Sequence, residues 1–229
     1  MDDARYQFEV ILLAARLEDA GYLVERIGYR SLTQSPDEIV TEVSGKIDAC
    51  CTGHRQKVHF VGHSLGGLLI RAYLQEHRVE HLGRVVLIGT PNQGTDLVDR
   101  FRDNWLFGLL GPTTAALGTD GARLPSTLPA PYYPVGVIAG VRDSGRNDHL
   151  LPGRDDGLAP VESTKLEGMT DFIEVESGHS MMRYDKEVAR QVIAFLQQGK
   201  FLHTADDRSD GAFSGFMLPK GNETSNWSI

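Results

Sequence analysis

Short apolar runs and stretches with helical spacing alternate along most of the chain. The apolar runs predict strands at 22–27, 58–61, 85–88, 135–139 and 172–175. Apolar positions on one side predict a helix at 4–20, and a cap residue, an N1 proline and an acidic first turn predict one at 35–50. Further helices are predicted at 65–77 and 185–197. Runs with no polar face are typical of strands buried on both sides. The alternation therefore predicts a doubly wound, mostly parallel α/β sheet.

Two stretches fall outside this alternation. Residues 95–133 form a long insertion between two predicted strands, and its aromatic and leucine residues argue against disorder. Residues 201–229 are polar and glycine-rich without a clear period, so we expect a tail with little structure. The expected organisation is one domain over residues 1–200, with a small insertion at 95–133, followed by a polar tail at 201–229.

Composition narrows the class of protein. A chain of 229 residues with 41% hydrophobic and 24% charged residues suits one soluble domain with a substantial core, or at most two small ones. Its net charge of −8 disfavours nucleic acid and anionic membrane surfaces as partners. The acidic start does not suit a signal peptide, and no apolar stretch reaches the length of a membrane span, so we expect no stable membrane insertion.

The only two cysteines, Cys50 and Cys51, are adjacent. Neighbouring cysteines make a strained disulfide at best, so we expect two half-buried thiols at a helix end. Free thiols suit a reducing compartment, which predicts a cytoplasmic protein.

The segment Gly62-His63-Ser64-Leu65-Gly66 lies between the strand at 58–61 and the helix at 65–77. The pattern G-x-S-x-G between a strand and a helix is typical of a nucleophile elbow, in which a strained turn exposes the serine. We expect a Cβ at position 62 or 66 to crowd the neighbouring backbone. Ser64 is the candidate nucleophile, and we expect His63 to point into the structure beside the site.

A serine nucleophile needs a base, and the base needs a carboxylate that orients it. After an elbow of this kind the expected chain order is serine, acid, histidine. His179 follows the last predicted strand and is the candidate base. The loop after 135–139 contains two adjacent carboxylates. We prefer Asp156, because Gly157 directly after it allows a tight turn. Asp155 remains the main alternative, and Asp148 and Asp143 are weaker ones.

Two further motifs concern an oxyanion and a metal. The backbone N–H of Leu65 begins the helix after the serine, where a negative charge is favoured, so it is a candidate oxyanion donor. Residues His77 to His81 have the H-x-x-E-H spacing of zinc peptidases. The helix should end there, Gly83 follows and no third ligand is evident, so we predict no metal site.

Four segments, taken in order, resemble the α/β-hydrolase lipases and esterases, in particular bacterial esterases of the triacylglycerol-lipase type. They are Gly62-His63-Ser64-Leu65-Gly66-Gly67, Gly89-Thr90-Pro91-Asn92-Gln93-Gly94-Thr95, Asp156-Gly157 and Gly178-His179, within a likeness from about Ala4 to Phe201. The resemblance implies hydrolysis of carboxylic esters through an acyl-enzyme, without a cofactor. Ser64 would attack, His179 would act as base and then acid, and Asp156 would orient His179.

The resemblance also assigns a substrate pocket. The insertion at 95–133 would be a lid or cap, with Trp105, Phe107 and Leu109 lining an acyl pocket. His63 would contribute to substrate binding beside the nucleophile.

One part of the family pattern is absent. In the family, a strand and a His-Gly loop that supplies the second oxyanion donor precede the first helix, but Met1 lies only a few residues before that helix. The absent strand would lie between those at 22–27 and 58–61, so we expect these two to pair directly or another segment to fill the gap. Loss of one oxyanion donor costs about 10²–10³ in rate, so we expect an upstream start, a rebuilt site or weak activity.

The leading hypothesis is a serine carboxylesterase or lipase acting on short- to medium-chain acyl esters. The alternatives are a truncated, non-catalytic hydrolase-fold binding protein and an acyltransferase that uses the same triad. A homodimer in which a second subunit covers the gap is also open.

Overall fold

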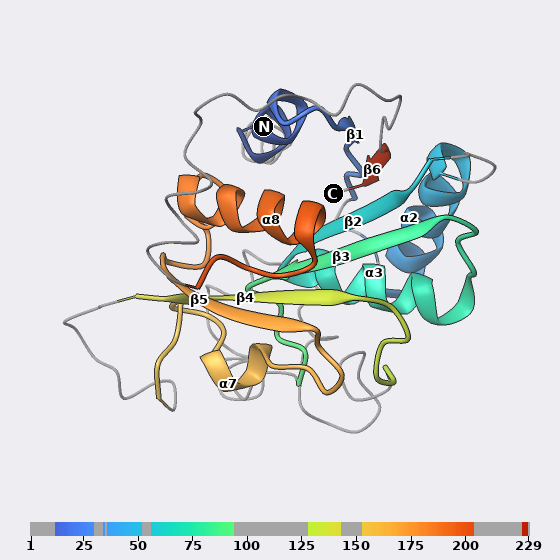
Figure 1. Ribbon diagram of the computed structural model, residues 1–229. Coiled ribbons are helices and arrows are strands. Elements are labelled where there is room, and N and C mark those ends of the chain that lie inside the picture. The colour runs from blue at the N-terminus through green and yellow to red at the C-terminus, as the bar shows by residue number, and fades with distance from the viewer. Residues whose placement is uncertain are drawn as a thin grey trace, which may run out of the picture.

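A single parallel sheet organises the chain. The computed structural model describes residues 12–29, 34, 36–51, 56–93, 128–142, 153–203 and 226–228. Within this part, six strands pair in the order β1-β6-β2-β3-β4-β5, and every pair is parallel (Figure 1). The strands are β1 (Leu23–Glu25), β2 (Val58–His63), β3 (Leu82–Ile88), β4 (Val135–Val141), β5 (Asp171–Glu176) and β6 (Asn226–Ser228). The predicted parallel α/β sheet is confirmed.

The described helices lie close to their predicted positions, and residues 4–11 of the first predicted helix lie outside the described residues. They are residues 12–19, α2 (Pro36–Cys51), α3 (Leu65–Glu76), α7 (Val161–Thr164) and α8 (Lys186–Gln198). The side chain of Asp185 caps α8 by accepting from two backbone N–H groups, and Gly199 ends it in the left-handed conformation. The four-residue α7 is too short to have a periodic pattern, and the sequence did not predict it. None of these helices has the length and apolar character of a membrane span.

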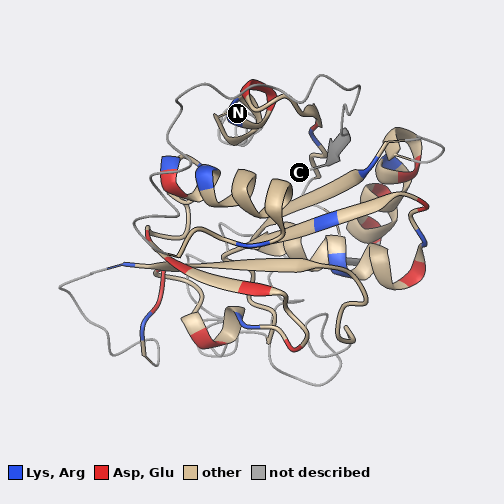
Figure 2. Ribbon diagram, viewed as in Figure 1, with Lys and Arg blue, Asp and Glu red and all other residues tan. Residues whose placement is uncertain are grey.

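Helices cover both faces of the sheet (Figure 1). On one face, Val86 and Ile138 pack with α8 and the helix at 12–19. On the other, Val85 and Val137 pack with α2 and α3. Successive strand side chains point to opposite faces, so burial of both faces explains the continuous apolar runs. Figure 2 shows β2 and β4 without charged residues, while most charges lie on the surrounding helices and loops.

The strand β6 fills the gap expected between the strands at 22–27 and 58–61. Its middle residue, Trp227, pairs with Val24 of β1 and His59 of β2. Figure 1 shows this red strand beside the blue β1. The sequence predicted no strand in the tail, because a polar three-residue segment has no detectable period. The flanking strands supply the reason for the pairing, since their backbone groups need partners.

The prediction of two free thiols is wrong. Cys50 and Cys51 form a disulfide at the end of α2. The cytoplasmic setting loses this support and stays a prediction.

Candidate active site

Ser64 lies in a strained turn between β2 and α3. Its backbone angles are φ 54° and ψ −124°, and it is the one non-glycine residue with positive φ among the described residues. Such a conformation costs of order 1–3 kcal/mol and persists only where surrounding contacts enforce it. One such contact is the N–H of Ser64, which donates to the carbonyl oxygen of Ile88 at 2.9 Å. The serine therefore lies at the carboxyl edge of the sheet, as the elbow pattern predicts.

The glycines of the elbow have different surroundings. A Cβ on Gly62 would lie 2.6 Å from the backbone nitrogen of Gly67, so the prediction of crowding at position 62 is correct. At Gly66 it is wrong for the described part of the chain, because none of its atoms lies within 4 Å of a Cβ there. The crowded position is Gly67, whose Cβ would lie 2.1 Å from the Thr90 hydroxyl oxygen. Gly67 faces the segment that follows β3, whereas Gly66 faces open space.

The structure brings Ser64, His179 and Asp156 into contact. The Nε2 atom of His179 lies 3.0 Å from the Ser64 Oγ, and its Nδ1 atom lies 2.7 Å from the Asp156 Oδ2. A carboxylate only accepts hydrogen bonds, so Nδ1 carries the proton in the neutral ring and the Nε2 lone pair faces the serine hydroxyl. This is the tautomer that a general base requires.

The carboxylate of Asp156 is buried and fully hydrogen-bonded. Its Oδ1 accepts from the N–H groups of Leu158 at 2.9 Å and Ala159 at 2.7 Å, and its Oδ2 accepts from His179. These donors offset the cost of burying the charge. The alternative acid, Asp155, instead accepts from the N–H of Gly157 at 2.6 Å. Gly157 has φ 98°, which fits the tight turn predicted after the acid.

The loop of His179 is held from two sides. Its N–H donates to the carbonyl oxygen of Asp156 at 2.8 Å. Its own carbonyl oxygen accepts from the Nε2 of His63 at 2.9 Å, and the two imidazole rings lie 4.7 Å apart. Burial lowers the pKa of His63 well below its ordinary value, so this ring is neutral. His63 lies beside the site, as expected, with its Nε2 engaged by the histidine loop.

The structure says less about the predicted oxyanion donors and the predicted pocket residues. Leu65 begins α3, and the first N–H groups of a helix have no partner within the helix. Its role as an oxyanion donor stays a prediction. A second donor is not assigned. Trp105, Phe107 and Leu109 lie outside the described residues.

A comparison with protein families adds to this geometry. Residues 51–123 match the sequence profile of a family described as "alpha/beta hydrolase fold". The match includes β2, the Ser64 elbow, α3 and β3. The match covers only this part of the chain; together with the parallel sheet it supports an α/β-hydrolase fold.

Solved structures similar to this chain include Bacillus licheniformis lipase BlEst2 in its mature form, at 18% identity and TM-score 0.47, covering 62% of this chain and 66% of that chain. The propeptide form of BlEst2 has 19% identity and TM-score 0.48, covering 62% and 36%. A lipase-esterase related protein from Clostridium acetobutylicum has 13% identity and TM-score 0.43, covering 89% and 86%. The matches thus span less than two thirds of each BlEst2 chain. No curated protein matches the sequence.

Two residues beside the site were given no role there by the sequence, although Gly89 belongs to one of the family-like segments. Gly89 has φ 55°, and a Cβ there would lie 3.1 Å from the Asp156 Oδ2 and 3.2 Å from the Met182 sulfur. Met182 is fully buried, and its sulfur lies near Gly89 together with Asp156 and His179. The available signal was a glycine directly after an apolar strand, where a close backbone approach is common.

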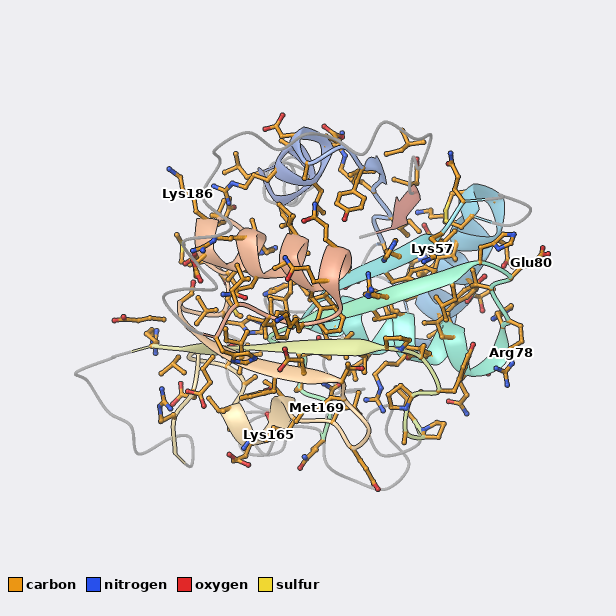
Figure 3. The ribbon with its side chains drawn as sticks, viewed as in Figure 1. Lys57, Arg78, Glu80, Lys165, Met169 and Lys186 are labelled. Carbon is orange, nitrogen blue, oxygen red and sulfur yellow. A yellow bond between two sulfur atoms is a disulfide. The ribbon has the colours of Figure 1, made fainter. Side chains whose placement is uncertain are left out.

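The spacing of His77 and His81 does not correspond to a zinc-binding helix. Helix α3 ends at Glu76, and His77 already has an extended backbone with φ −117°. The Nδ1 atom of His77 lies 3.1 Å from the carbonyl oxygen of Tyr73. Figure 3 shows Arg78 and Glu80 on the same side of the molecule as Lys57, where β2 begins, whereas Ser64 follows its other end.

Proposed function

We propose that this α/β-hydrolase is a serine carboxylesterase or lipase. The observation that carries the proposal is the His179 ring, which contacts the Ser64 Oγ with one nitrogen and the Asp156 carboxylate with the other. A nucleophile, a base and a group that orients the base are the parts that acyl transfer from an ester requires.

In the acylation step, His179 Nε2 takes the hydroxyl proton of Ser64 as Oγ attacks the ester carbonyl carbon. The carbonyl oxygen becomes an oxyanion that the Leu65 N–H can stabilise. His179 then gives the proton to the alcohol oxygen as the ester C–O bond breaks. The alcohol leaves, and the acyl group remains on Ser64.

In the deacylation step, water replaces the alcohol. His179 takes a proton from water as its oxygen attacks the acyl carbon, and returns that proton to the Ser64 oxygen when the bond to the serine breaks. The carboxylic acid leaves, and no cofactor takes part. Throughout, the buried Asp156 carboxylate stabilises the positive charge that forms on His179.

The substrate is proposed as a short- to medium-chain acyl ester. Pocket-lining roles for Trp105, Phe107 and Leu109, the cytoplasmic location and a homodimer stay predictions from the sequence. We likewise predict that neither nucleic acid nor an anionic membrane surface is a partner, because the net charge is −8.

The test is hydrolysis of p-nitrophenyl butyrate by the wild type and by Ser64→Ala, with Ser180→Ala as the matched control. Ser180 is an exposed serine in the loop of His179. We expect Ser64→Ala to abolish hydrolysis and labelling by a fluorophosphonate probe, and Ser180→Ala to retain both. Equal hydrolysis by wild type and Ser64→Ala would contradict the proposal.

The same experiment distinguishes the two alternatives. A non-catalytic binding protein would show neither hydrolysis nor labelling of Ser64 in the wild type. An acyltransferase would be labelled, but with an added alcohol it would form mainly the new ester rather than the free acid.

A further inference from the structure

A buried arginine lies on the helix that carries the nucleophile. Arg71 is in α3, about two turns after Ser64, and only 4% of its surface is exposed. A buried guanidinium is costly unless its N–H groups are hydrogen-bonded. Its Nη1 donates to the Asn92 Oδ1 at 3.0 Å, and its Nη2 donates to the carbonyl oxygens of Leu128 at 3.1 Å and Pro129 at 3.3 Å.

Asn92 connects this arginine to a second element. Its side chain is buried, and its Nδ2 donates to the carbonyl oxygen of Thr164, in α7, at 2.7 Å. The amide orientation is determined by its partners, because Arg71 only donates and a carbonyl oxygen only accepts. The next residue adds a parallel link, since the N–H of Gln93 donates to the carbonyl oxygen of Ser163 at 2.9 Å. Asn92 thus joins α3 to α7 through one side chain.

Helix α7 continues directly from the loop of the proposed triad acid. The N–H of Val161, its first residue, donates to the carbonyl oxygen of Arg154 at 2.8 Å and closes this loop at its base. Inside the loop, the N–H of Ala159 donates to the Asp156 Oδ1. A shift of α7 would therefore displace the Asp156 carboxylate from His179.

We propose that Asn92, held by Arg71, is a positioning residue that fixes the Asp156 loop relative to the helix of Ser64. The inference rests on the proposed esterase function. Asn92 touches none of the three triad side chains in the contacts described here, so it acts through the placement of Asp156. A displacement of about 1 Å in a reacting group can cost about 10²-fold in rate, so a small shift in this bridge is sufficient to affect turnover.

The test is the substitution Asn92→Asp. An aspartate keeps an oxygen for Arg71 but loses the N–H that reaches Thr164, so it breaks only the part of the bridge toward the acid loop. We expect kcat for p-nitrophenyl butyrate to fall about 10- to 100-fold with KM within about twofold. A loss of binding would raise KM instead. The neutral variant Asn92→Ala removes the side-chain contacts to both Arg71 and Thr164. It should likewise lower kcat and leave KM nearly unchanged.

Arg84→Met is the matched control. Arg84 is a partly buried arginine in β3 that donates from its side chain to the carbonyl oxygen of Leu196, in α8, and touches no part of the bridge. We expect this variant to lower the melting temperature while kcat stays within about twofold of the wild type.

The outcomes separate the two proposals. If Asn92→Asp and Asn92→Ala are folded at the assay temperature and keep the wild-type kcat, the positioning role is wrong. If only one of them folds, a wild-type kcat in that variant is enough to overturn it. If the wild type neither hydrolyses esters nor reacts with the fluorophosphonate, the esterase proposal itself is wrong.

Discussion

The Nε2 atom of His63 lies 2.9 Å from the backbone carbonyl oxygen of His179, so the residue before the candidate nucleophile holds the loop of the candidate base. A carbonyl oxygen only accepts, and His63 therefore donates with a protonated Nε2. This contact joins the end of β2 to the segment after β5 and helps to place the His179 ring over Ser64.

Replacing His63 should weaken the contact that holds the loop of His179. His63→Phe keeps an aromatic ring beside His179 but removes the donor, so we expect a loss of about 1 kcal/mol in unfolding free energy and a lower kcat. His63→Gln, which retains an N–H donor, should be closer to the wild type. Denaturant unfolding and ester hydrolysis measure both effects. A phenylalanine variant with wild-type stability and kcat would show that the contact is unimportant.

Replacement of the two adjacent aspartates should lower kcat by very different amounts. Asp156→Asn replaces the acceptor at His179 Nδ1, which favours the wrong tautomer of the ring, and in a Ser-His-Asp triad this change costs about 10⁴ in kcat. Asp155→Asn keeps an oxygen for the Gly157 N–H and should lower kcat less than about tenfold. Steady-state kinetics of both variants check the prediction. The opposite ranking would assign the triad acid to Asp155.

The elbow glycines should respond differently to alanine. Gly62→Ala and Gly67→Ala place a methyl group against packed atoms and should destabilise the protein by about 1–3 kcal/mol. Gly66→Ala meets open space within α3 and should be neutral or stabilising by up to about 1 kcal/mol, because alanine favours helix. Thermal unfolding of the three variants gives the order. Equal losses at 66 and 67 would be inconsistent with the packing described here.

His59 should make stability depend on pH. Its Nδ1 accepts from the N–H of Arg84 at 3.0 Å, and burial, together with the charges of Arg84 and Lys57, lowers its pKa to about 4. Between about pH 6.5 and pH 4 the unfolded chain binds a proton that the folded protein does not. The contribution of neutral His59 to the free energy of unfolding is therefore present above about pH 6.5. It is lost as the pH falls toward 4, which lowers this free energy by up to roughly 3 kcal/mol.

The measurement for His59 is the unfolding free energy from pH 8 to pH 4. His59→Gln should flatten this dependence, and His81→Gln, which changes an exposed histidine, should leave it as in the wild type. A His59→Gln variant with the wild-type slope would exclude His59 as the source.

The strand β6 should protect its neighbours from exchange with solvent. Trp227→Pro removes a backbone N–H from the middle of a strand flanked on both sides, which a sheet interior tolerates poorly. We expect faster hydrogen exchange at the amides of β1 and at Val58 to Phe60, together with a lower melting temperature. Ser209→Pro, outside β6, is the control. Unchanged exchange in Trp227→Pro would mean that β6 does not occupy this position.

Local patterns were sufficient for most elements. The strands and helices around Ser64 were predicted because their apolar spacing reports which face is buried, and that spacing is contained in a few neighbouring residues. The short α7 and β6 were missed, since neither lies in an apolar run or has a detectable period. The disulfide between Cys50 and Cys51 was missed because a bond between neighbouring cysteines was expected to be strained.

The sequence by itself determined the order of the elements, the serine elbow and the candidates that follow it in the chain. Only the tertiary structure decided that Asp156 rather than Asp155 contacts His179, that Gly67 rather than Gly66 is packed, and that β6 fills the gap beside β2. The hydrogen bonds from Arg71 to Asn92 and from Asn92 to Thr164 were also decided only by the tertiary structure. Each of these contacts joins residues that are distant in the chain, and hydrogen bonds act only within about 3 Å, so loop paths in three dimensions select among candidates that local patterns leave equivalent.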